Sequence, residues 1–212
     1  MIKRSLLAGM ISVLVGQAQA AVFTDRTDFE AAINLGYKET FESMTAGTYG
    51  LTGPLALPSG LVVSSPSNEL FAVGVGQSSN PTQAIGSNFP SEDSLKFTLG
   101  GDFRAFGGDF FQNLGGGAQS GSSFDFLFSF FDDGNLVASM TGSVAPNGGS
   151  FFGYAGTSLF DTVEVLAQTA AFEVADNITV GDQGRNQVPE PASLALAALG
   201  LAALVSRRKL AA

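Results

Sequence analysis

The strongest constraint on the fold is a stretch in the middle of the chain where phenylalanine alternates with other residues. From Phe124 to Phe130 every second residue is phenylalanine, and in a β-strand this period places all the rings on one face. Asp125 and Ser129 then face the opposite way. Burying one such ring contributes about 1.5–3 kcal/mol, so the stretch predicts a strand at the centre of a hydrophobic core.

Further short stretches of this kind recur between residues 21 and 187, separated by Gly, Pro, Asn and Ser. We expect strands at Lys38–Ser43, Leu61–Ser65, Glu69–Val75, Ser94–Leu99, Arg104–Gln112, Ser123–Phe131, Leu136–Gly142, Phe151–Ala155, Thr162–Ala167 and Ala171–Val180. Long helical crossovers are missing from the pattern, which argues against a parallel α/β fold. The sequence therefore predicts one all-β domain over residues 21–187, an antiparallel, jelly-roll-like β-sandwich of roughly ten strands.

Two local features interrupt the strands. Thr27 and Glu30 have the spacing of a capping box, which predicts a short N-terminal helix at Thr27–Asn34 that covers one end of the sandwich. Asp132–Asn135 predicts a hairpin loop of three or four residues, with Gly134 in the left-handed conformation. A calcium loop is the alternative for this segment, but the spaced carboxylates and distal glutamate of an EF-hand are missing.

The N-terminus has the three regions of a secretory signal peptide. Lys3 and Arg4 are followed by the apolar run Leu6–Val15, and Ala18 and Ala20 supply the small residues of a cleavage site. The run is too short to span a bilayer, which needs about 20 residues in a helix. We therefore expect residues 1–20 to be removed on export.

The C-terminus combines a proline-framed motif, an apolar run and a basic cluster. In chain order these are Val188, Pro189, Glu190 and Pro191, then Leu194–Val205, then Arg207, Arg208 and Lys209. The two prolines favour an extended, exposed backbone around the glutamate. Cations directly after an apolar segment anchor it at the cytoplasmic face. We expect a C-terminal transmembrane helix with the folded domain outside.

This order of motif, helix and basic tail resembles the PEP-CTERM sorting signal of Gram-negative bacteria, over residues 188–212. The resemblance implies that an exosortase-type membrane protease acts near the motif while the inner membrane holds the tail transiently. It also implies a cell-surface or extracellular protein associated with exopolysaccharide. The alternative is a plain C-terminal membrane anchor behind a proline linker.

Charge and composition exclude several classes of partner and of catalytic or metal site. Residues 21–187 contain 18 of the 19 acids and only five of the ten cations, which gives a net charge of −13. Such a domain repels nucleic acid, so we exclude a nucleic-acid partner. The chain has no His, Cys or Trp, which excludes Ser-His-Asp and Cys-His catalysis and zinc sites built from His or Cys. No acidic motif marks a glycosidase pair. We expect a non-catalytic protein, and a glycoside-active enzyme is the third alternative.

A calcium-stabilised carbohydrate-binding module is the alternative function. Glu42 near the start and Asp176 in the last predicted strand resemble the acids beside the structural calcium of jelly-roll carbohydrate-binding modules. The first and last strands of such folds are often neighbours, and calcium takes six to eight oxygen ligands. Local hydrogen bonding at a strand end is the competing role for Asp176. Tyr37, Tyr49 and Tyr154 are the candidate sugar-stacking residues, since tryptophan is missing.

Overall fold

The computed structural model describes residues 20–45, 51–52, 54–67, 69–87, 93–113, 121–146, 148–169 and 171–184. They belong to one compact unit, Ala20–Arg185. The predicted sorting motif, apolar run and basic cluster, and the signal peptide up to residue 19, lie outside the described residues. Across the part that is described, no helix has the length and apolar character that crossing a membrane requires.

The described residues form one helix and twelve strands, where the sequence predicted about ten strands. In chain order these are β1 (Ala21–Phe23), α1 (Arg26–Ala32), β2 (Ile33–Glu39), β3 (Leu51–Thr52), β4 (Leu55–Ala56), β5 (Val62–Ser64), β6 (Glu69–Val73), β7 (Ala84–Ser87), β8 (Leu95–Asn113), β9 (Phe124–Asp132), β10 (Asn135–Val144), β11 (Gly149–Ala167) and β12 (Phe172–Gln183). All pairings are antiparallel, as predicted.

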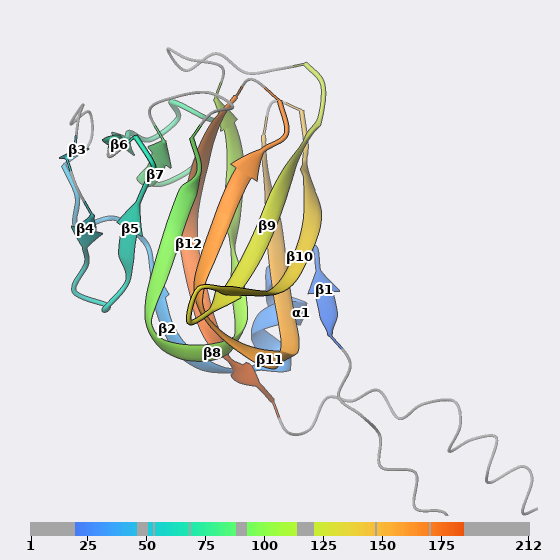
Figure 1. Ribbon diagram of the computed structural model, residues 1–212. Helices are drawn as coiled ribbons and strands as arrows, with labels where there is room; N and C mark the ends of the chain where they lie inside the picture. Colours follow the sequence, from blue (N-terminus) through green and yellow to red (C-terminus); the bar gives the residue numbers. More distant parts are fainter. Residues whose placement is uncertain are drawn as a thin grey trace, which may run out of the picture. The chain divides into compact units, whose positions relative to one another are not determined.

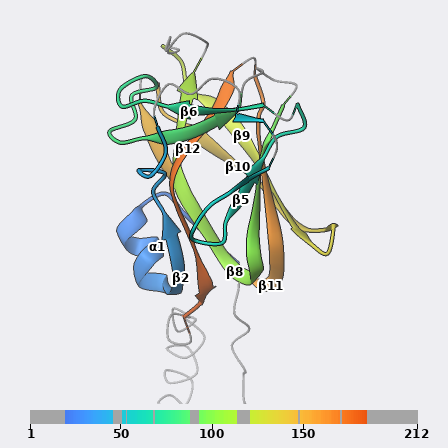
Figure 2. The same cartoon turned by 90° about the vertical axis from the view of Figure 1, so that its left-hand side faces the viewer.

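The strands form two layers, which Figures 1 and 2 show from two sides. The front layer contains β10, β9, the second half of β11, the first half of β8, β5 and β4. The back layer contains β1, the first half of β11, the second half of β8, β12 and the strands that pair with β12, namely β2 and β7. The predicted antiparallel β-sandwich is confirmed.

β8 and β11 pass from one layer to the other, and each is a single strand of 19 residues. The sequence predicted two strands in place of each, because Gly100 and Gly156 and their neighbours have the composition of turns. Gly100 has φ +72°, a conformation that glycine adopts at little cost. The register of β11 against β8 shifts between Ala155 and Phe160. These points are bends within continuous strands.

The predicted phenylalanine core is confirmed. Phe124, Phe126, Phe128 and Phe130 of β9 are all buried, and Asp125 is exposed. The rings of Phe126, Phe128 and Phe130 meet aromatic rings of the back layer. The closest contact is that of Phe128, which stacks on Phe152 of β11 at 3.8 Å between ring centroids.

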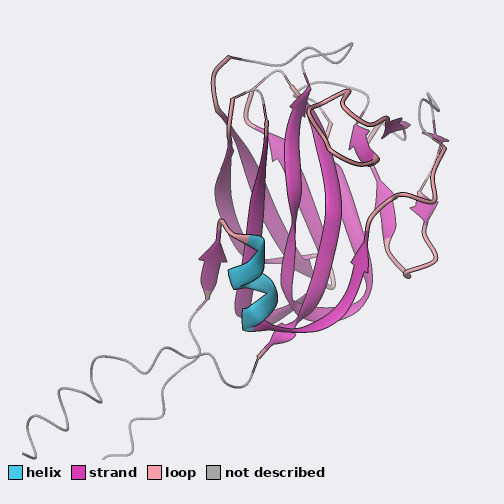
Figure 3. Ribbon diagram, turned by 180° about the vertical axis from the view of Figure 1, so that it is seen from behind, coloured by secondary structure: helices cyan, strands magenta, loops and turns pink. Residues whose placement is uncertain are grey.

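The helix starts one residue earlier than predicted and is capped differently. Asp25 is the N-cap, and its carboxylate accepts a hydrogen bond from the Asp28 backbone N at 3.0 Å. The predicted capping box of Thr27 therefore does not form. Phe29 packs α1 against Ala105 and Ala155, and Figure 3 shows the helix on the outer face of the strands.

Two strand-level predictions also change. The predicted strand Lys38–Ser43 is β2, which begins directly after the helix and ends at Glu39. The β9–β10 loop has two residues, Asp133 and Gly134, with φ of 48° and 79°. The left-handed Gly134 is confirmed, and the predicted loop length was wrong because the left-handed Asp133 shortens the turn.

Candidate functional site

A β-bulge in β12 positions the acidic residue that the sequence singled out. The register of β12 against β8 shifts between Asp176 and Thr179. Asn177 within the bulge has φ +52°, a left-handed conformation that asparagine tolerates better than most residues. Bulges redirect side chains and are common beside functional sites. Here the bulge turns the side chains of Asp176 and Asn177 toward polar neighbours.

The structure brings Glu42 and Asp176 to one short segment. β2 pairs with β12, and Glu39 lies opposite Ile178, so the chain after β2 runs toward Asp176. Glu42 Oε1 accepts a hydrogen bond from the Gln83 backbone N at 2.9 Å. The hydroxyl of the preceding residue, Thr82, donates to Asp176 Oδ2.

A second carboxylate lies directly across the strand pair. Asp109 of β8 is the register partner of Asp176, and like charges in such positions repel. Asn177 compensates, because its Nδ2 donates to Asp109 Oδ2 at 2.9 Å and to Asp176 Oδ2 at 3.1 Å. Arg26 of α1 forms an ion pair with Asp109 at 3.0 Å. The Arg26 guanidinium also lies 4.7 Å from the centre of the Phe151 ring.

The Asp176 side chain is fully buried, and its protonation reflects this environment. The pKa of Asp176 is raised to about 6, chiefly by burial and in addition by the nearby charges of Asp109 and Glu42. Hydrogen bonds from Thr82 and from the Asn177 backbone N, the latter at 2.6 Å, act in the opposite direction. The cluster therefore has more negative than positive charge and favours a proton or a cation.

The donor set for a cation is small. Nowhere in the described part of the chain do three or more Asp, Glu, His or Cys residues gather as a metal-holding group. Gln83 Oε1 is a buried oxygen that has no hydrogen-bond partner in the structure, and it belongs to the residue whose backbone N contacts Glu42. Calcium at this point stays a prediction, and neutral oxygens would have to supply most of its ligands.

β12 carries a second buried acid that the sequence analysis missed. Glu173 faces the interior between the layers, is fully buried, and accepts hydrogen bonds from the Ser87 hydroxyl and from the Ala167 backbone N at 2.6 Å. Burial raises the pKa of Glu173 to about 7. The signal was present in the sequence, because Glu173 is an acid between the apolar residues Phe172 and Val174 at the start of the strand.

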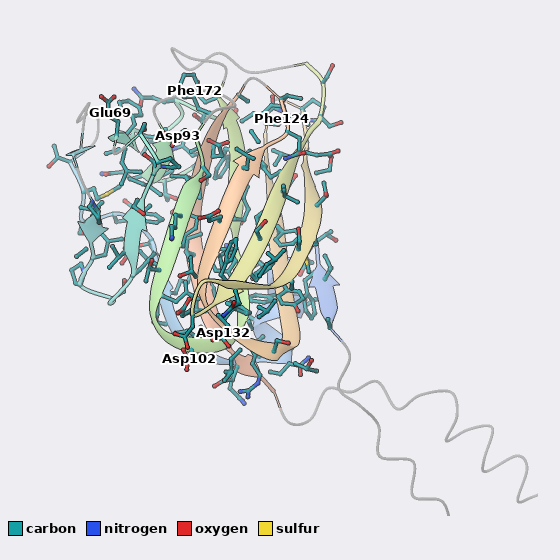
Figure 4. The ribbon with its side chains drawn as sticks, viewed as in Figure 1. Glu69, Asp93, Asp102, Phe124, Asp132 and Phe172 are labelled. Carbon is teal, nitrogen blue, oxygen red and sulfur yellow. The ribbon has the colours of Figure 1, made fainter. Side chains whose placement is uncertain are left out.

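Figure 4 shows how acids are distributed along the sandwich. Asp93 lies at the same end as Phe172, the first residue of β12, and Asp102 and Asp132 lie at the opposite end. Asp93 is also buried, and its charge adds to the raised pKa of Glu173. Asp93 and Glu173 are therefore buried acids at the end where β12 starts.

Two of the candidate sugar-stacking tyrosines are committed to the fold. Tyr37 is half-buried and its hydroxyl donates to the Leu99 carbonyl at 3.1 Å. Tyr154 is buried and packs on Phe130 at 4.6 Å between ring centroids. Tyr49 lies outside the described residues. Neither described tyrosine presents a free ring face to a sugar.

The solved structures that match this chain include a xylanase, a xylan-binding domain and a fucosidase. The CBM22-1–GH10 modules of an endo-1,4-β-D-xylanase from Clostridium thermocellum, complexed with xylohexaose, match with 13% identity and a TM-score of 0.40 over 70% of this chain and 28% of that one. The CBM22-1 xylan-binding domain of Paenibacillus barcinonensis matches with 11% identity and a TM-score of 0.38, over 72% of this chain and 98% of that one. A GH29 fucosidase from Ruminococcus gnavus matches with 11% identity and a TM-score of 0.35, over 64% of this chain and 28% of that one.

No curated protein sequence matches the chain. The family model described as the PEP-CTERM protein-sorting motif matches residues 187–209, which include Val188–Pro191 and Arg207–Lys209. The C-terminal segment of this chain is therefore a PEP-CTERM protein-sorting signal, as the order of motif, apolar run and basic cluster predicted.

Proposed function

We propose that the chain is an exported protein that an exosortase-type membrane protease sorts to the cell surface or extracellular matrix, where its β-sandwich acts without catalysis in association with exopolysaccharide. The match of residues 187–209 to the sorting motif carries this proposal. The predicted signal peptide starts export, and the predicted apolar helix Leu194–Val205 holds the tail in the inner membrane until it is processed.

The fold is compatible with processing at the motif. β12 ends at Gln183, before the matched segment begins at residue 187. A cut near Pro189 therefore leaves every described strand in place. The strongly negative domain also suits a hydrated polysaccharide environment, because its charge keeps it soluble.

The side chains of the described sandwich support a structural role. Asp109 is paired with Arg26, and Glu173 is buried against Ser87. A cavity of about 110 Å³ opens beside β10, and no ionisable side chain lines it. Acid–base catalysis needs a titratable group within hydrogen-bond reach of its substrate, and this cavity does not offer one.

The sorting claim is tested by replacing Pro189, Glu190 and Pro191 with alanine in the full chain and following its mass and its cellular fraction. We expect the unprocessed mass to accumulate in the membrane fraction. The control variants Pro54→Ala and Pro58→Ala change prolines of the domain and should be processed normally. Normal processing and location of the motif variant would refute the sorting proposal.

A calcium-stabilised carbohydrate-binding module is the second candidate. It is favoured by Glu42 and Asp176 reaching the same segment, where Gln83 Oε1 has no hydrogen-bond partner. The test compares thermal melting in calcium and in chelator for the wild type, Glu42→Gln and Asp176→Asn, together with a glycan array. A calcium-dependent rise of the melting temperature that both variants lose would support this candidate. No shift and no glycan signal would reject it.

A further inference from the structure

β10 is an exposed sheet edge with unusual composition for this protein. It pairs with β9 on one side, and no described strand pairs with its other side. Its ten residues contain no charge and no proline, within a region whose net charge is −13. After a bulge near Leu136, the pairing from Ala138 to Val144 is regular. This leaves a straight row of unpaired backbone groups facing outward.

The other described edges are protected in the usual ways. β1 has three residues, and β3 and β4 have two each. β2 carries Lys38 and Glu39, and Lys38 forms an ion pair with Glu30 of α1 at 3.4 Å. Short strands and edge charges both prevent association between sheets. Among the described edges, β10 is long and lacks both protections.

A hollow lies beside this edge on the inner side of the strand. Its floor is formed by the rings of Phe110, Phe128 and Phe152, and β10 contributes Thr141–Val144 to its wall. Figure 1 shows β1 and β10 on the same side of the sandwich, and Val22 of β1 lines the same hollow. A Cβ at Gly142 would lie 2.7 Å from Phe152 and 2.9 Å from Phe128, so these two rings pack directly against the glycine at the edge of the hollow.

We propose that two copies of this chain associate through β10, as an antiparallel pair with Met140 of each copy opposite Gly142 of the other. Every second residue of a strand faces the same side of the sheet. Met140 and Gly142 both face the inner side, because Met140 packs against the core and Gly142 faces Phe128 and Phe152. In this register the methionine of each copy lies opposite a residue of the other copy that has no side chain to crowd it, at the edge of the hollow.

The same register explains the rest of the strand. Thr141 lies on the two-fold axis, opposite its own copy, and Ser139 lies opposite Ser143. These exposed hydroxyl positions form the Thr–Thr and Ser–Ser pairs that stabilise antiparallel strands. Because β10 is uncharged, two acidic domains meet here without direct repulsion between facing side chains. The pairing is isologous and closes at a dimer.

The chain has no cysteine, so single cysteines test the register directly in the full-length protein. Thr141→Cys places two thiols opposite each other at a separation that allows a disulfide. We expect a covalent dimer under mild oxidation. Ser139→Cys is the matched control, because the two copies of residue 139 are four positions apart along the strands, about 13 Å. Equal cross-linking of both variants, or none at Thr141→Cys, would overturn the proposal.

A charge variant tests the interface without a covalent bond. Thr141→Lys places two like charges on the axis and should weaken self-association at least about tenfold in sedimentation velocity. Leu136→Lys, at an exposed residue outside the regular segment, should associate as the wild type does. If Thr141→Lys also associates as the wild type does, another segment, such as the C-terminal tail, holds the copies together and the proposed interface is wrong.

Discussion

Replacing Glu173 with glutamine should remove a large part of the pH dependence of the stability of the sandwich. The carboxyl group is fully buried and joins three strands, because it belongs to β12 and accepts hydrogen bonds from Ser87 of β7 and Ala167 of β11. Glutamine has the same shape as the protonated acid. Its carbonyl accepts from the Ala167 backbone N, and its amide donates to the Ser87 hydroxyl.

The sign of this pH dependence follows from the linkage between folding and proton binding. Burial raises the pKa of Glu173 from its ordinary 4.5 to about 7, so between these values the unfolded chain releases a proton that the folded protein retains. The contribution of the protonated acid is fully present below pH 4.5 and is lost as the pH rises through about 7. Each pH unit in this interval corresponds to about 1.4 kcal/mol, so the total loss is about 3 kcal/mol.

Urea unfolding followed by circular dichroism, from pH 4 to 8.5, measures the effect. At pH 8.5 the free energy of unfolding of Glu173→Gln should exceed that of the wild type by about 2–3 kcal/mol, and at pH 4 the two should agree within about 0.5 kcal/mol. Glu164→Gln is the control, since Glu164 is partly exposed and lies 3.8 Å from Lys96. Parallel pH profiles for the wild type and Glu173→Gln would refute the reasoning.

Three further predictions concern the sandwich and are checked by urea unfolding. Arg26→Leu leaves Asp109 without its ion pair at 3.0 Å, and the loss should be about 2 kcal/mol, because both side chains are mostly buried. Gly134→Ala, at φ +79°, should cost about 1 kcal/mol, whereas Gly121→Ala, whose added carbon meets open space, should cost almost nothing. A chain that ends at Gly184 should keep the unfolding midpoint of the full chain, because it retains every described strand.

The sequence was most informative where structure depends on neighbours along the chain. The alternation from Phe124 to Phe130 predicted both the strand and its buried face, because every second side chain of a strand must share a face. The left-handed Gly134 was also predictable, since few other residues adopt that conformation.

The sequence was less informative where distant segments decide the outcome. A glycine pair such as Gly100-Gly101 is compatible both with the end of a strand and with a bend that takes the strand into a second sheet. β8 bends because both of its halves pair with β11, whose partner residues lie between 38 (Phe111 and Gly149) and 70 (Leu95 and Val165) positions further on. The proximity of Glu42 and Asp176 was predictable from the expected neighbouring of first and last strands. The contributions of Asp109 and Arg26 to the site were not predictable, because they depend on the register of the strands and on the packing of the helix.

The position of β12 connects the fold to the sorting signal. β12 lies between β8 and β2 in the back layer, and only Gly184, Arg185 and Asn186 separate its end from the matched segment. The back layer is therefore complete only when the residues next to the sorting signal have paired. On the proposed function, a cut at the motif falls beyond Gln183, the last residue of β12, and so breaks no described strand pairing. If the chain is processed as proposed, the back layer keeps all of its described strands after the cut, because β12 ends before the motif.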